Sequence, residues 1–100
     1  METAEFKQII EENGIVVAKF SAEWCSPCRT MEPIVKSVAD KMEGEIKVVT
    51  IDVEESPDIA TEYRIRNIPT IIYFKDGEIK DKSVGAMSEK ELTQRINNLM

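Results

Sequence analysis

Two cysteines, Cys25 and Cys28, are the residues of this chain best suited to chemistry, and their spacing is C-x-x-C. A disulfide between them would close a very small loop and constrain the unfolded chain little, so stabilising the fold is a poor reason for the pair. A structural zinc site needs four ligands, and the chain has neither a second C-x-x-C nor a histidine. A metal shared between two copies is one alternative, but a reversible redox pair uses both cysteines and needs no metal.

The position of Cys25 favours a reactive thiolate. An apolar run over residues 15–20 predicts a buried strand, and a helix is expected to begin at Cys25. The free N–H groups and positive end of a helix lower the pKa of a thiol below about 8.5. Pro27 is tolerated in a first turn, and Cys28 lies within disulfide reach. We expect Cys25 to be exposed and to attack, and Cys28 to be covered and to resolve, with no cofactor required.

The surroundings of the pair argue against two inert, buried small residues, which is the simplest alternative. Trp24 precedes Cys25 in a loop, where an indole beside a reactive thiol is expected to form part of a docking surface. Glu23 is not expected to be catalytic, because its negative charge would disfavour a thiolate. The absence of histidine excludes histidine-based catalytic triads.

Composition narrows the class of protein. The length of 100 residues predicts a single domain over residues 1–100, and 42% hydrophobic with 32% charged residues argues against disorder. The net charge of −6 argues against a nucleic-acid partner. No apolar run approaches the roughly 20 residues of a membrane span, and the acidic start is not a secretory signal. We therefore expect a cytoplasmic monomer with neither membrane nor nucleic-acid partners.

The helices alternate with short apolar strands. Thr3 is expected to be the N-cap of a first helix that ends at Asn13-Gly14. Pro33 is expected to kink the second helix, which Gly44 closes. Strands are expected over residues 15–20, 46–53, 70–74 and 78–84. A third helix is expected from Ser56-Pro57 to Tyr63. A last helix begins at the capping box Ser88–Glu91 and carries Leu92, Ile96 and Leu99 on one face. The last two strands form a hairpin at Asp76-Gly77. This order predicts an α/β sandwich around a four-stranded mixed sheet flanked by four helices.

The segment Phe20–Cys28, which ends in W-C-S-P-C, resembles the W-C-G-P-C active-site segment of the thioredoxin family. The similarity covers almost the whole chain and continues through residues 39–40, 51–54, 63–70, 74–77 and 84–86. It implies a protein-disulfide reductase, recharged by a thioredoxin reductase that draws on NADPH. It also implies a cis Ile68–Pro69 bond beside the cysteines, with the Ile68 backbone pairing with substrate. The rest of the implied groove comprises Trp24, Ser26, Pro27, Gly85 and Ala86.

The chain departs from the family pattern at several positions. Ser26 replaces the usual glycine, Thr50 replaces a usual lysine, and the segment before Phe6 is too short for the usual first strand. We therefore expect a trimmed sheet. Lys19 stands where the family usually buries an aspartate behind the cysteines. Either the Lys19 amine reaches water while its stem packs, or it is desolvated beneath the cysteines, where it would favour a thiolate and relay a proton.

Three functions are compatible with these residues. A reductase is favoured, and an oxidase or isomerase would use the same cysteines at a different redox potential. A redox-silent binding module is disfavoured because it would need neither cysteine. The C-P-Y-C pattern of a glutaredoxin is absent.

Overall fold

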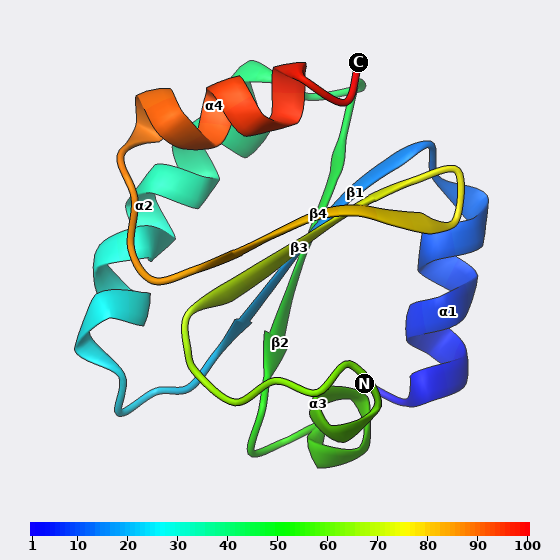
Figure 1. The fold of residues 1–100 in the computed structure, drawn as a ribbon, viewed down its shortest axis with the longest axis vertical. Coiled ribbons are helices and arrows are strands. Elements are labelled where there is room, and N and C mark those ends of the chain that lie inside the picture. The colour runs from blue at the N-terminus through cyan, green and yellow to red at the C-terminus, as the bar shows by residue number, and fades with distance from the viewer.

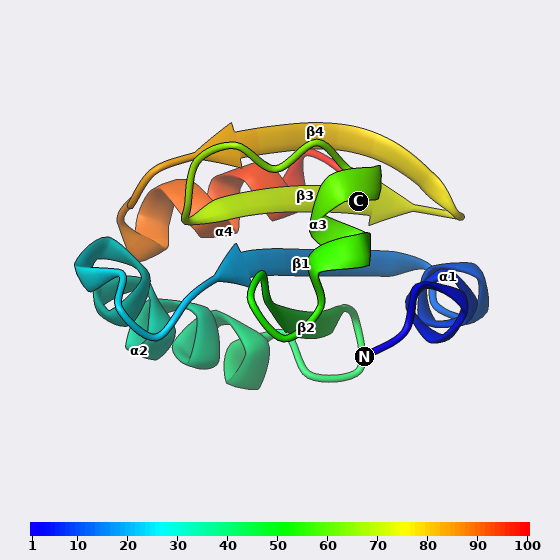
Figure 2. The ribbon, with the colours of Figure 1, turned by 90° about the horizontal axis from the view of Figure 1, so that it is seen from below.

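The computed structural model describes residues 1–100 as a central sheet with helices on both faces. The elements in chain order are α1 (Thr3–Glu12), β1 (Ile15–Ser21), α2 (Ser26–Lys41), β2 (Lys47–Asp52), α3 (Pro57–Glu62), β3 (Thr70–Lys75), β4 (Glu78–Val84) and α4 (Glu89–Asn97). The four strands are ordered β2-β1-β3-β4, as Figure 2 shows, and β1 is parallel to β2 and antiparallel to β3. The predicted α/β sandwich with a trimmed, mixed sheet is therefore confirmed.

Each face of the sheet has its own apolar core, because successive residues of β1 point to opposite faces. Val16, Ala18 and Phe20 pack with Phe6 of α1 and Ile59 of α3. On the other face, Ile15 and Val17 of β1 pack with buried residues of α2 and α4, namely Met31, Val35, Val38, Leu92 and Ile96. Figure 1 shows α2 and α4 on one side of the strands and α1 with α3 on the other. The central strand β1 is buried along its whole length.

Several element ends differ from the sequence predictions. The prediction of Thr3 as an N-cap was wrong: Glu2 occupies the N-cap, and its side chain makes no capping bond. Helix α2 ends at Lys41, before Gly44, and continues through Pro33. Leu99 lies beyond the end of α4, although it still packs on the core. These ends are set by tertiary packing more than by single capping residues, which contribute about 1 kcal/mol each.

Turn and cap chemistry was predicted correctly elsewhere. Asp76 and Gly77 have φ of 53° and 84°, the positive values that a tight hairpin requires. The Ser88 hydroxyl accepts a hydrogen bond from the Glu91 N–H at 3.1 Å, as a capping box requires. None of the helices is both long and apolar enough to cross a membrane.

The strand register gathers four chain segments at one edge of the sheet. Phe20 of β1 aligns with Ile51 of β2 and Thr70 of β3, and Thr70 also aligns with Val84 of β4. The ends of β1, β2 and β4 and the start of β3 therefore lie together. The segments that leave this edge hold Cys25 and Cys28 at the start of α2, Ile68-Pro69 before β3 and Gly85 after β4, so the topology brings the predicted site residues to one edge.

Candidate functional site

Cys25 and Cys28 form a disulfide at the start of α2, with their Cα atoms 5.2 Å apart. Cys25 is the N-cap residue, and its Sγ accepts a hydrogen bond from the Cys28 backbone N–H at 3.2 Å. The Arg29 N–H donates to the Cys25 carbonyl, which begins the helix, and Pro27 occupies the first turn as predicted. The helix start therefore directs an N–H donor at the sulfur of Cys25.

The two sulfurs are both shielded in this disulfide form. Cys25 is 5% exposed and Cys28 is 1% exposed. The prediction that Cys25 is exposed was therefore wrong for the disulfide form, although Cys25 is the more accessible of the two. Val53 and Ile68, from distant loops, pack on the cluster that the two cysteines form with Ala22.

The Ile68–Pro69 bond is cis, as the family resemblance implied. Ile68 packs on the cluster formed by both cysteines, and the Pro69 carbonyl accepts a hydrogen bond from the Gly85 N–H at 2.8 Å. Gly85 has a φ of 95°, a left-handed conformation that glycine adopts without steric strain. The structure thus brings Ile68, Pro69 and Gly85 to the disulfide.

The remaining predicted groove residues lie on the surface around this edge. Ser26, Pro27 and Ala86 are exposed, and the Ser26 carbonyl accepts a hydrogen bond from the Thr30 hydroxyl at 3.3 Å. Trp24 is 68% exposed, the largest exposed aromatic side chain of the molecule. The indole of Trp24 therefore presents apolar area to solvent.

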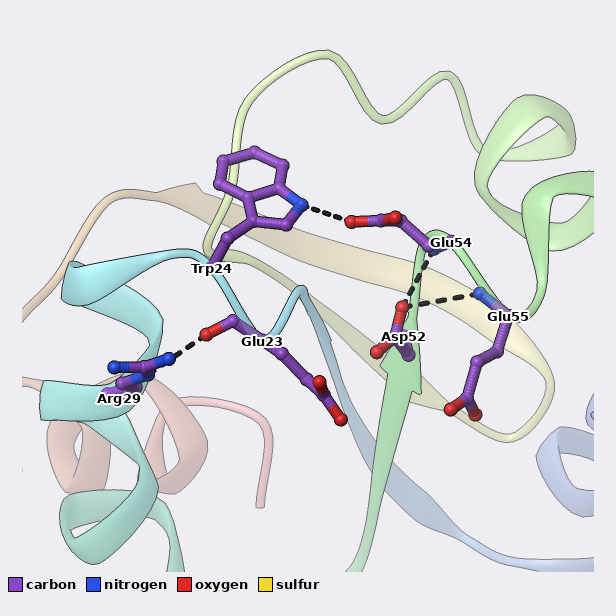
Figure 3. A pocket seen from close by; sticks show the side chains of 6 residues that line it. All are labelled: Glu23, Trp24, Arg29, Asp52, Glu54 and Glu55. Atoms are coloured by element: carbon purple, nitrogen blue, oxygen red, sulfur yellow. Dashed lines mark hydrogen bonds between the residues drawn. The ribbon is translucent and has the colours of Figure 1, made fainter.

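Trp24 is held at the edge of a polar hollow of about 460 Å³ (Figure 3). Its indole Nε1–H donates a hydrogen bond to the Glu54 carboxylate. Asp52 ends β2 and accepts hydrogen bonds from the backbone N–H groups of Glu54 and Glu55 at 2.8 and 3.3 Å, which fixes the turn that presents Glu54. Arg29 donates to the Glu23 carbonyl at 2.9 Å on the other side.

Sequence reasoning missed the roles of Asp52, Glu54 and Arg29. Asp52 and Glu54 lie about 30 residues from Trp24, and their approach depends on the parallel pairing of β1 with β2. One local signal was available, because an aspartate at a strand end commonly bonds to backbone N–H groups two and three residues later.

Lys19 is buried in the centre of β1 and is only 1% exposed. Desolvation lowers the pKa of Lys19 below its ordinary value, while the negative charge of Glu32 raises it. None of the ion pairs includes Lys19. The Lys19 side chain therefore does not have the predicted arrangement in which its amine reaches water, and its role toward the cysteines stays a prediction.

Comparison with known proteins agrees with this geometry. The sequence profile of the family described as Thioredoxin matches residues 1–98. The chain is 43% identical over 95 residues to a thioredoxin of Porphyra purpurea, covering 94% of this chain and 89% of that one. It is 41% identical over 92 residues to thioredoxin 1 of a Nostoc species, covering 91% and 86%. The X-ray structure of Fasciola hepatica thioredoxin superposes with a TM-score of 0.92 at 31% identity, covering 99% and 95%.

The fold and the cysteine pair at a helix start define a thiol–disulfide oxidoreductase. The chain belongs to the thioredoxin family. Its Cys25–Cys28 pair is the redox-active disulfide of a disulfide reductase that acts on protein disulfides.

Proposed function

We propose that Cys25 is the attacking residue and Cys28 the resolving residue of this reductase. The observation that carries this assignment is the hydrogen bond from the Cys28 N–H to the Cys25 Sγ. In the reduced protein the same donor and the positive helix end stabilise negative charge on Cys25. Cys28 is 1% exposed against 5% for Cys25, so Cys25 is the cysteine that a substrate disulfide reaches more readily.

The exchange proceeds in two displacements. The Cys25 thiolate attacks one sulfur of a substrate disulfide, which forms a mixed disulfide and releases the other substrate sulfur as a thiolate that takes up a proton. Cys28 then loses its proton and attacks the Cys25 sulfur, and the second substrate thiol leaves. The substrate gains two electrons and two protons, and the protein ends with the Cys25–Cys28 disulfide.

Docking of the substrate chain is assigned to the surface around the disulfide. Ile68 and Pro69 supply a backbone edge beside the cysteines, and Gly85 is tied to that edge through the Pro69 carbonyl. Trp24, which precedes Cys25 in the chain, supplies exposed apolar area. Ser26, Pro27 and Ala86 complete the accessible rim.

We further propose an NADPH-linked thioredoxin reductase as the source of electrons. A reductase must be returned to the dithiol form after each turnover, and a cytoplasmic location would supply reducing equivalents. Residues 1–100 would act as a single-domain monomer. Incubation with a thioredoxin reductase and NADPH should reduce the Cys25–Cys28 disulfide; NADPH consumption no greater than without the protein would contradict this partner.

Insulin reduction with dithiothreitol tests the activity. The wild-type chain should accelerate precipitation of the insulin B chain, and Cys25→Ser should abolish the acceleration. Cys28→Ser should instead accumulate a mixed disulfide between Cys25 and insulin, visible by mass spectrometry. A mixed disulfide formed by Cys25→Ser but not by Cys28→Ser would reverse the two roles.

An oxidase or isomerase would use the same cysteines. The equilibrium of the pair with glutathione separates these functions, because a reductase requires a strongly reducing couple.

A further inference from the structure

Lys19 is a buried lysine that the disulfide-exchange steps above do not use. It lies in the central strand between Thr50 of β2 and Ile71 of β3. Its side chain is 1% exposed and is in none of the ion pairs. Removing an ammonium group from water without a partner is unfavourable, so the fold is destabilised by keeping a lysine at this position.

The Lys19 side chain lines a surface hollow of about 290 Å³ on the α2 face of the sheet. The other residues around this hollow are Glu32, Val35, Lys36, Ala39, Val48 and Thr50. Glu32 follows Cys28 by four residues in α2, so the two share one face of the helix about one turn apart. Glu32, on the rim of the hollow, therefore lies one helical turn from the resolving cysteine.

We propose that Lys19 is a positioning residue whose buried positive charge stabilises the thiolates of the reduced Cys25–Cys28 pair. This inference rests on the proposed roles of the two cysteines. Lys19 shares its hollow with Glu32, which follows Cys28 by one helical turn. A positive charge on Lys19 has no thiolate to interact with in the disulfide form and gains a favourable interaction in the reduced form. Lys19 therefore makes the pair less strongly reducing, since stabilising the reduced thiolate form raises the redox potential.

The charges that face Lys19 determine the pH range of this effect. From α2 these are Glu32 and Lys36, with Cys28 one helical turn before Glu32. The neighbouring strands β2 and β3 contribute Thr50 and Ile71, which do not titrate. Desolvation lowers the pKa of Lys19, and Glu32 raises it and so helps to keep the ammonium protonated. The effect vanishes at low pH, where both thiols are protonated, and again at high pH, where Lys19 is neutral. It is largest between these limits.

The equilibrium with glutathione measures the effect directly. In this reaction the protein disulfide and two glutathione thiols yield the protein dithiol and one oxidised glutathione. Replacing Lys19 by the similarly sized but neutral methionine should shift the equilibrium towards the protein disulfide by about tenfold, which is about 30 mV for a two-electron couple. The difference between wild type and Lys19→Met should pass through a maximum as pH rises and then decrease.

Lys36→Met is the matched control. It removes the same charge from the rim of the same hollow, but the Lys36 side chain is 79% exposed and therefore screened by water. The control should change the equilibrium less than twofold. Equal shifts in the two variants, or no shift in Lys19→Met, would overturn the proposal.

A measurement on the wild-type protein avoids any dependence on how the variant folds. Nuclear magnetic resonance of the Lys19 side chain should show a higher pKa in the reduced protein than in the disulfide form, because the interaction with the thiolates is mutual. An identical Lys19 pKa in the two forms would overturn the proposal. A different result would contradict the proposed function alone. In that case the Lys19 pKa is higher in the reduced protein, as expected, but the protein does not reduce insulin.

Discussion

The indole N–H of Trp24 donates a hydrogen bond to the carboxylate of Glu54, a residue 30 positions later in the sequence. This bond joins the loop before α2 to the turn after β2, and Asp52 orders that turn through its own hydrogen bonds to backbone N–H groups. The bond therefore restrains the most exposed aromatic side chain of the molecule, and Figure 3 shows the contact between the two side chains.

Removing this bond should weaken substrate docking. In Glu54→Ala the indole loses its acceptor, and the expected loss of about 1 kcal/mol corresponds to about fivefold in kcat/KM for insulin. Glu54→Gln keeps an acceptor oxygen and should retain most of the activity. Glu55 lines the same hollow, so Glu55→Ala serves as the control. Equal losses in Glu54→Ala and Glu55→Ala would show that surface charge, not the bond, sets docking.

Gly85→Ala should destabilise the protein through backbone conformation alone. A Cβ at Gly85 would meet no atom within 4 Å, but its φ of 95° lies in the region that L residues rarely adopt. We expect a loss of about 1–2 kcal/mol in the free energy of unfolding, measured with urea. Gly14→Ala is the control, because Gly14 has equal space and no positive φ. A loss at Gly85 no larger than that at Gly14 would contradict this account.

The stability of the disulfide form should depend on pH through Lys19. The folded protein lowers the pKa of Lys19 from 10.5, so the unfolded chain binds its proton more tightly. At a pH below the pKa of Lys19 in the folded protein, the charged lysine lowers the free energy of unfolding. This loss of stability disappears as pH rises from that pKa to 10.5, the value in the unfolded chain. Lys19→Met should therefore be more stable than wild type at neutral pH, by about 1–2 kcal/mol.

Urea unfolding of both proteins across this pH range checks the sign. The advantage of Lys19→Met should diminish as pH approaches 10.5, where both states of the wild type lose the proton. Lys36→Met should show no such trend, since Lys36 is exposed. A Lys19→Met protein that is less stable than wild type at neutral pH would contradict the argument.

Most of the fold was predictable because its signals are local. Strand β4 was expected over residues 78–84 and lies at Glu78–Val84, since the Asp76-Gly77 turn fixes where it begins. The start of α1 was misassigned because Thr3 is only a weak local signal. Packing of Phe6 against β1 and α3 outweighs such a preference.

The features of the site that depend on one contiguous segment could be predicted from the sequence. The features that depend on contacts between distant segments could be predicted less well. The helix-start position of Cys25 follows from a strand, a loop and a proline that are contiguous in sequence. The packing of Val53 and Ile68 on the cluster that contains Cys25 brings together distant loops, which no local pattern predicts. The burial of Lys19 likewise depends on β1 lying between β2 and β3, an order that no local pattern specifies.

The pKa of Cys25 in the reduced protein tests the central claim most directly. Thiolate absorbance in the ultraviolet, followed against pH in wild type and in Cys28→Ala, isolates the titration of Cys25. The helix start and the Cys28 N–H should hold the pKa of Cys25 at least one unit below the value of about 8.5 for a free thiol. A pKa at or above that value would contradict the assignment of Cys25 as an activated nucleophile.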